Sequence, residues 1–278
     1  MAKFKCNICG QTFEADKMPE KCPICQADSS NIEEVHEPDA EPKAKKKKKG
    51  LDTSGNVYTV CYAAVMVIIV AFLLAFVSSS LSGIQNANVE NDTKGQILTA
   101  LGYDKATVNV GEVYEQNVKD SLWDKETMQM KPYEGKFKTS YGGAIKSGEL
   151  HVFTATAADG SKAYVIPVTG RGLWGGLWGY IAIDQNKQTV LGTYFYHEGE
   201  TAGLGALIGD RPFQEQFIGK PIFAEGVDGI ALTVVKNGTP KKGEYEIDGV
   251  TGATLTSNGV AGMIQDGLGA YITFINNK

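Results

Sequence analysis

Four cysteines near the N-terminus have the spacing of a metal site. The segment CNICGQTFEADKMPEKCPIC follows the pattern C-x2-C-x12-C-x2-C. Each pair can wrap a turn around one ion with its thiolates pointing inward, and two such pairs form a tetrahedral sulfur site for zinc or for a single iron. This spacing argues against a chance grouping of free thiols. We therefore expect a metal ion bound by Cys6, Cys9, Cys22 and Cys25.

A cluster of hydroxyl groups near the C-terminus could face an anion. The stretch DGVTGATLTSNGV covers Asp248 to Val260 and precedes an apolar, helix-like segment. A helix beginning near Ser257 leaves unpaired N–H groups there, and its dipole favours an anion at that end. The hydroxyls of Thr254, Thr256 and Ser257 would then surround a phosphate. Ordinary helix capping at a tight Gly-Ala turn is the alternative, and spacing alone favours it.

The run from Val57 to Val77, VYTVCYAAVMVIIVAFLLAFV, contains no charged side chain over 21 residues. At 1.5 Å per residue, this length is enough to cross a hydrocarbon core of about 30 Å. A signal peptide would lie at the extreme N-terminus and have a shorter apolar core. We therefore predict a transmembrane helix over 57–77.

Six lysines between Lys43 and Lys49 come just before this run. The positive-inside rule then predicts a cytoplasmic N-terminus and a large extracytoplasmic C-terminal part. The net charge of -5 argues against nucleic-acid binding. No cysteine follows Cys61, so the outer part must be stabilised by its own core and not by disulfides.

The chain divides by composition into a cysteine module at 1–36, a charged lysine-rich linker at 37–56, the membrane helix at 57–77 and an outer domain at 78–278. After the membrane span, apolar residues recur at an irregular helical spacing, which predicts that a helix continues or follows there. From about Glu149, short runs rich in β-branched and aromatic residues, ELHVFTATA, KAYVIPV, GYIAID, QTVLGTYFYH and IALTVVK, predict an antiparallel sheet. A final helix presents Val260, Ile264, Leu268 and Ile272 on one face. The predicted fold class is α+β.

The cysteine module resembles the rubredoxin-like domains of rubrerythrins, through CxxCG, Phe13, PEKCPxC and the acidic segment SSNIEEV. This resemblance implies iron in preference to zinc. The position after the fourth cysteine is usually glycine in that family, because backbone N–H groups must turn toward sulfur, and here it is Gln26.

The stretch DGVTGAT matches the pattern D-x-x-[ST]-G-A-[ST] of proteins that carry covalent FMN. In those proteins a flavin transferase uses FAD to attach FMN through its phosphate to the final hydroxyl, here Thr254. The resemblance gives Asp248 a role in recognition by the transferase. Gly252 and Ala253 would leave room for the phosphate. The remaining motif candidates are Thr251 and Thr256.

GRGLWGGLWGYIAID and HEGETAGLGA resemble segments of the NqrC family, which are FMN-carrying subunits of the Na+-translocating NADH:quinone oxidoreductase, and the likeness extends over about residues 58–278. In that family a glycine-rich loop lies against the isoalloxazine ring. The resemblance therefore implies FMN contacts from Glu200, Thr201, Gly203 and Leu204. Leu173, Trp174 and Trp178 offer apolar surface for the ring, although core packing or a subunit contact explains the tryptophans equally well.

The resemblance implies a redox subunit with no catalytic side chain of its own, in which FMN carries the electrons. Its partners would be the other membrane subunits of the complex and, during maturation, the flavin transferase. It would be a single-pass protein of the inner membrane, with its N-terminus in the cytoplasm and its FMN domain in the periplasm. Three alternatives remain: a G-type subunit of the ferredoxin:NAD+ oxidoreductase complex, a stand-alone extracytoplasmic flavin reductase, and a non-redox adaptor with a zinc ribbon.

Overall fold

The computed structural model describes residues 2–35, 55–239 and 241–277. Two compact units make up the chain, Met1–Leu74 and Ala75–Lys278. The lysine run and almost all of the predicted linker at 37–56 lie outside the described residues.

The N-terminal module is a small three-stranded antiparallel sheet in the order β2-β1-β3. Its elements are β1 (Ala2–Cys6), β2 (Thr12–Ala15), the 3-10 helix η1 (Ser29–Asn31) and β3 (Ile32–Glu34). The buried side chains are those of Phe4, Cys6, Cys22 and Ile32. With so small a core, a domain of this size commonly needs a metal to fold.

Helix α1 (Asn56–Ala100) is continuous over 45 residues and contains the predicted membrane span. Within the described residues it is the one helix long and apolar enough to cross a membrane. Its apolar side chains from Val57 to Val77 are exposed, whereas Ile97 and Leu98 near its C-terminal end are fully buried in the outer domain. The helical pattern expected after the span is therefore the same helix, continued.

The outer domain is built on a six-stranded antiparallel sheet in the order β5-β4-β6-β7-β8-β9. Its strands are β4 (Val118–Asp124), β5 (Gln129–Pro132), β6 (Leu150–Thr156), β7 (Lys162–Arg171), β8 (Gly176–Asp184) and β9 (Val190–His197). The remaining elements are α2 (Val110–Asn117), α3 (Gly142–Lys146), η2 (Gly205–Gly209), α4 (Arg211–Gln214), η3 (Glu215–Phe217), β10 (Thr233–Val235), β11 (Glu246–Asp248), α5 (Thr254–Ala270) and α6 (Ile272–Asn276).

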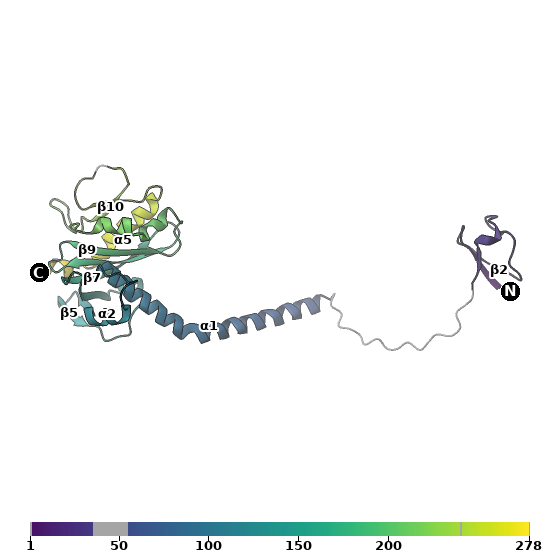
Figure 1. Cartoon of the computed structure of the whole chain (residues 1–278), viewed down its shortest axis with the longest axis horizontal. Helices are drawn as coiled ribbons and strands as arrows, with labels where there is room; N and C mark the ends of the chain where they lie inside the picture. Colours follow the sequence, from purple (N-terminus) through teal and green to yellow (C-terminus); the bar gives the residue numbers. More distant parts are fainter. Residues whose placement is uncertain (1, 36–54, 240, 278) are drawn as a thin grey trace. The chain divides into compact units, whose positions relative to one another are not determined.

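Both faces of the sheet are covered, so the domain has two cores. On one face, Ile166, Val168 and Ile181 pack against Val260 and Ile264 of α5. On the other, Phe153, Val165 and Tyr180 pack against the end of α1 and against α2. Figure 1 shows this layering, with α5 and β10 on one side of β7 and β9 and α2 on the other. The α+β prediction is confirmed.

Two details differ from the sequence predictions. The expected strand IALTVVK shortens to β10, which pairs in parallel with β11 outside the main sheet, because the N–H groups of Ala231 and Leu232 donate to the Ile222 carbonyl instead. Helix α5 begins at Thr254, three residues before Ser257, and ends at Ala270, so Ile272 belongs to α6. The earlier start places the Thr254 hydroxyl in the first turn of the helix.

Candidate functional site

The four cysteine sulfurs form a cluster with the dimensions of a tetrahedral metal site. All four Sγ atoms lie within 4.8 Å of one another. The Cys6 and Cys25 sulfurs are 3.7 Å apart, and those of Cys9 and Cys22 are 3.8 Å apart. A tetrahedral ion with metal–sulfur bonds of about 2.3 Å separates its ligands by about 3.8 Å. The residues present therefore fit a bound Zn or Fe ion, as the sequence predicted.

The two cysteine turns have the same backbone geometry, although only one ends in glycine. The Gly10 N–H donates to the Cys6 carbonyl at 2.8 Å, and the Gln26 N–H donates to the Cys22 carbonyl at 3.0 Å. Gly10 has φ +68° and Gln26 has φ +62°. A non-glycine residue rarely adopts this left-handed conformation. Gln26 therefore supports the second turn as glycine would, at a cost in backbone strain.

The pKa values of two of the clustered thiols are shifted in opposite directions. Hydrogen bonds from the backbone N–H groups of Cys9 and Ile8 lower the pKa of the Cys6 thiol to about 7. The Ala27 N–H acts in the same direction on Cys25, but burial and its three cysteine neighbours outweigh it and raise the pKa of Cys25 to about 12. Four thiolates this close repel one another, and a metal cation removes that penalty.

Thr254 lies at the surface with a free hydroxyl. It is the first residue of α5, and its side chain is exposed. No group in the described part of the chain hydrogen-bonds to its hydroxyl. The preceding Ala253 occupies the N-cap position and supplies no side-chain acceptor, so the helix start keeps its unpaired N–H groups. An anion esterified to Thr254 would lie where the helix dipole favours it.

Thr256 and Ser257 do not offer hydroxyls to the surface, and neither side chain caps the start of α5. Both are buried. The Ser257 hydroxyl donates to the Ala253 carbonyl at 2.9 Å and accepts from the Val250 N–H at 3.0 Å. The Thr256 hydroxyl donates to the Glu200 carboxylate at 2.5 Å. Of the three hydroxyls expected to surround a phosphate, only that of Thr254 is exposed.

Glu200 is a buried carboxylate that ties three segments together. One oxygen accepts from the hydroxyl of Thr256 in α5, and the other accepts from the backbone N–H of Trp174 at 2.9 Å. The Glu200 N–H donates to Nδ1 of His197 at 3.2 Å. Burial alone would raise the pKa of Glu200, but the bonds from Thr256 and from the Trp174, Gly175 and Leu173 N–H groups outweigh it and lower that pKa. The carboxylate is therefore a charged anchor within the protein.

An exposed apolar patch surrounds the start of α5. We define it as Leu173, Trp174, Leu204 and Leu255, which are 49%, 70%, 42% and 60% exposed. Trp174 is connected to α5 through Glu200, and a Cβ on Gly252 would lie 3.1 Å from Leu204. Large exposed apolar side chains gathered in one place mark a binding surface. Thr201 and Gly203, in the loop that carries Leu204, are exposed as well.

The remaining motif residues are fixed by partners that sequence analysis did not identify. The Asp248 carboxylate pairs with Lys241 at 2.9 Å, and its backbone N–H and C=O bond to the Gln216 side chain. The Thr251 hydroxyl accepts from Asn237 at 2.7 Å. Gly252 has φ +78°, which glycine adopts without strain. No local pattern in the sequence indicates these long-range partners.

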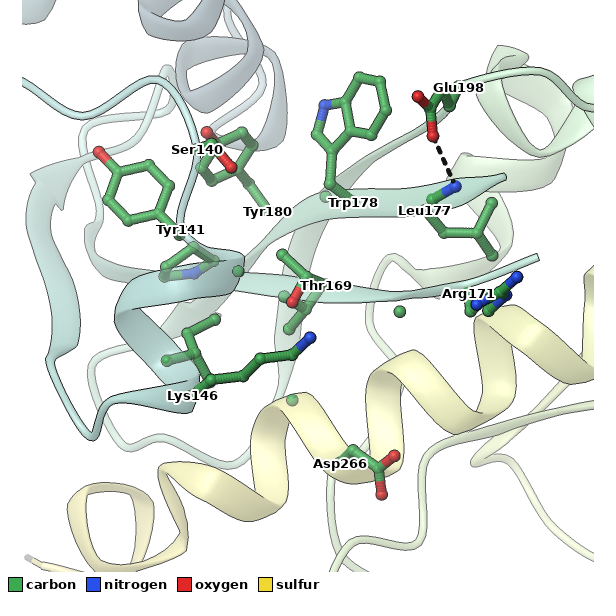
Figure 2. Close-up of a pocket in the computed structure, with 18 of the residues that line it drawn as sticks. Ser140, Tyr141, Lys146, Thr169, Arg171, Leu177, Trp178, Tyr180, Glu198 and Asp266 are labelled. Carbon is green, nitrogen blue, oxygen red and sulfur yellow. Dashed lines mark hydrogen bonds between the residues drawn. The ribbon is translucent and has the colours of Figure 1, made fainter. Parts of the chain in front are cut away.

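The structure separates Trp178 from the apolar patch. Its indole N–H donates to Gln96 of α1 at 3.4 Å, and its ring packs against Tyr196. It lines a different cavity, beside β7 (Figure 2). His151 is fully buried and hydrogen-bonds to Asp120 at 2.9 Å. Trp178 is therefore half-buried beside this cavity and lies apart from the apolar patch.

The described fold and site define a flavoprotein subunit with an FMN-binding domain and a small cysteine-ligated metal module. Family models agree with this class: residues 172–269 match the FMN-binding domain, and residues 4–33 match the rubrerythrin, rubredoxin-like domain. The chain belongs to the NqrC family of Na(+)-translocating NADH-quinone reductase subunits. The predicted resemblances are confirmed, and so is the predicted class, an FMN-carrying electron-transfer subunit of an oxidoreductase.

Three relatives illustrate the similarity, and the first and third are covered over most of their length. The NqrC protein of Vibrio campbellii is 30% identical over 66% of this chain and 80% of its own length. The NqrC protein of Chlamydia caviae is 42% identical, but the match covers only 40% of this chain and 39% of that protein. The crystal structure of the NqrC protein from Parabacteroides distasonis superposes with a TM-score of 0.64 at 35% identity, covering 71% of this chain and 98% of that one.

Proposed function

We propose that this chain carries FMN as a phosphoester on the Thr254 hydroxyl and relays electrons within a Na+-translocating NADH:quinone reductase. The observation that supports the proposal is the position of Thr254: an exposed, unbonded hydroxyl in the first turn of α5, inside a matched FMN-binding domain. When bound, FMN supplies the redox chemistry, because it accepts and donates single electrons.

The residues around Thr254 have distinct proposed roles. Gly252 and Ala253 keep the approach to the hydroxyl free of bulky side chains. Asp248, Thr251 and the small residues of the motif present it to the flavin transferase. The apolar patch and the exposed loop at Thr201 and Gly203 cover the ring and keep water from it.

Glu200 has a different role from the one the resemblance implied. Its carboxylate is buried and already accepts two hydrogen bonds from the protein. A carboxylate so engaged is poorly placed to contact the ring. We assign Glu200 as a positioning residue that fixes the Trp174 turn and the Leu204 loop against α5.

The chain is anchored through α1, and we propose that its N-terminus is cytoplasmic and its FMN domain periplasmic. The lysine run that supports this orientation lies outside the described residues. The partners proposed are the other membrane subunits of the complex. The proposed ion in the cysteine module is iron, and metal analysis of protein from native cells that finds zinc alone would exclude it.

The attachment site is tested on a denaturing gel viewed under ultraviolet light. The full chain is produced with a flavin transferase as wild type, Thr254→Ala, Thr254→Ser and Thr239→Ala. We expect a fluorescent band in all but Thr254→Ala, because serine keeps the hydroxyl and Thr239 is an exposed threonine outside the motif. A band that survives in Thr254→Ala refutes the assignment.

A further inference from the structure

Strand β7 is longer than the partner on one of its sides. It pairs with β6 only between Phe153↔Val165 and Thr156↔Lys162. It pairs with β8 over its full length, as far as Arg171↔Gly176. Residues 166–171 are therefore paired with a strand on one side only within the described structure. An unpaired strand edge is a template for pairing with another chain.

The hydrogen-bond pattern shows which backbone groups face the open side. At the turn between β7 and β8, the Gly172 N–H donates to the Gly175 carbonyl at 2.9 Å. Bonded and non-bonded pairs alternate along an antiparallel ladder, so Gly170 and Val168 bond to β8. The backbone groups of Pro167, Thr169 and Arg171 point the other way. Proline is tolerated where its missing N–H faces an edge.

Not all of these groups remain available. The Arg171 carbonyl lies against Gly259 of α5, where an added Cβ would be only 2.5 Å away. Outside the strand ladders, the N–H groups of Thr169 and Arg171 and the carbonyls of Pro167 and Thr169 form no backbone hydrogen bond in the described part of the chain, and the ladder with β6 ends at Val165. These four groups form a short row of donors and acceptors beyond the end of the β6 ladder.

A cavity of about 730 Å³ runs along this row. Figure 2 shows it between α3, which carries Lys146, and α5, which carries Asp266, with β7 and β8 behind. The aromatic side chains of Trp178 and Tyr180, both in β8, line one side of the cavity. The edge is therefore recessed between two helices and is not an open flank of the sheet.

The charges in the cavity oppose each other, which argues against a small ionic ligand. Lys146 and Arg171 supply two positive charges, and Glu198 and Asp266 supply two negative ones. Within the described structure none of the four forms an ion pair. Main-chain donors and acceptors beside aromatic side chains suit an extended peptide, which adds as a strand through its backbone and places alternate side chains in pockets.

We propose that an extended segment of a partner polypeptide adds to β7 as a further strand at residues 166–171. Six residues of strand span roughly 20 Å. A second copy of the domain is not the occupant, since its own edge is recessed between the same two helices. The proposal depends on the proposed function only for the source of the segment, another subunit of the reductase complex.

Hydrogen exchange measured by mass spectrometry tests the edge directly. The full chain is compared alone in detergent and within the complex purified from native membranes. We expect the Thr169 and Arg171 amides to exchange quickly in the isolated chain and at least tenfold more slowly in the complex. Equal exchange in both samples overturns the proposal. So does slow exchange in the isolated chain that depends on its concentration, because that indicates pairing between copies.

Two matched variants separate main-chain from side-chain recognition. Thr169→Pro removes the edge-facing N–H, whereas Thr169→Ala keeps it and removes the hydroxyl. We expect Thr169→Pro to weaken retention in the complex by about 3- to 10-fold, the effect of one hydrogen bond, and Thr169→Ala to have little effect. Equal loss in both variants refutes main-chain pairing. The flavin band should persist in both variants, so a failure here is distinguishable from failure of the Thr254 assignment.

Discussion

At the scale of single residues, the site depends on one buried carboxylate. Glu200 accepts hydrogen bonds from the Thr256 hydroxyl and from the backbone N–H of Trp174. Both donors lose their partner if the Glu200 side chain is truncated. We expect Glu200→Ala to lower the free energy of unfolding by about 1–3 kcal/mol, and Glu200→Gln to lower it less because the amide oxygen still accepts. Urea unfolding at pH 7 measures both.

The pH dependence of stability gives a second test of Glu200. Its pKa is lowered in the folded protein, whereas the unfolded value is about 4.3. The ionised carboxylate therefore stabilises the fold fully above the unfolded pKa, and this contribution is lost as the pH falls through the folded pKa. The difference in stability between wild type and Glu200→Gln should shrink as the pH falls below the unfolded pKa. A difference that stays constant as the pH falls below the unfolded pKa contradicts the assignment.

At the scale of elements, α5 packs closely on the sheet through glycine. A Cβ on Gly259 would lie 2.5 Å from the Arg171 carbonyl oxygen, whereas a Cβ on Gly262 meets nothing within 4 Å. We expect Gly259→Ala to destabilise the domain by about 1–3 kcal/mol, because backbone must move. Gly262→Ala should stabilise it by up to about 1 kcal/mol through helix propensity. Thermal unfolding of the pair measures the contrast, and equal shifts would refute it.

Elements with a strong local pattern could be predicted from the sequence. The uncharged run from Val57 to Val77, the β-rich runs after Glu149 and the spaced cysteines each encode their structure within a few residues. Strand β4 has the sequence VKDSLWD, whose polar residues hide its place inside the sheet. The contact between Glu200 and Thr256 and the open edge of β7 depend on tertiary packing. No short window of sequence specifies them, whereas the left-handed conformation of Gln26 follows from the local cysteine motif.

At the scale of the whole molecule, the two compact units have separate cores. Cys9→Ser removes one metal ligand, and we expect the cysteine module to lose its ion and its folded structure. The melting temperature of the outer domain and its flavin band should not change. Metal analysis together with a thermal scan checks this. Loss of the flavin band in Cys9→Ser would show that the units depend on each other.

Helix α1 has two different surroundings along one continuous backbone. The side chains from Val57 to Val77 are exposed, whereas Thr93, Ile97 and Leu98 are buried in the outer domain. A protease that cuts between residues 78 and 92 would separate an intact outer domain from the apolar span. A cut after Leu98 would instead remove Ile97 and Leu98 from the core of the outer domain, and we expect the remaining fragment not to fold. The helix that carries the apolar span is therefore also part of the core of the outer domain.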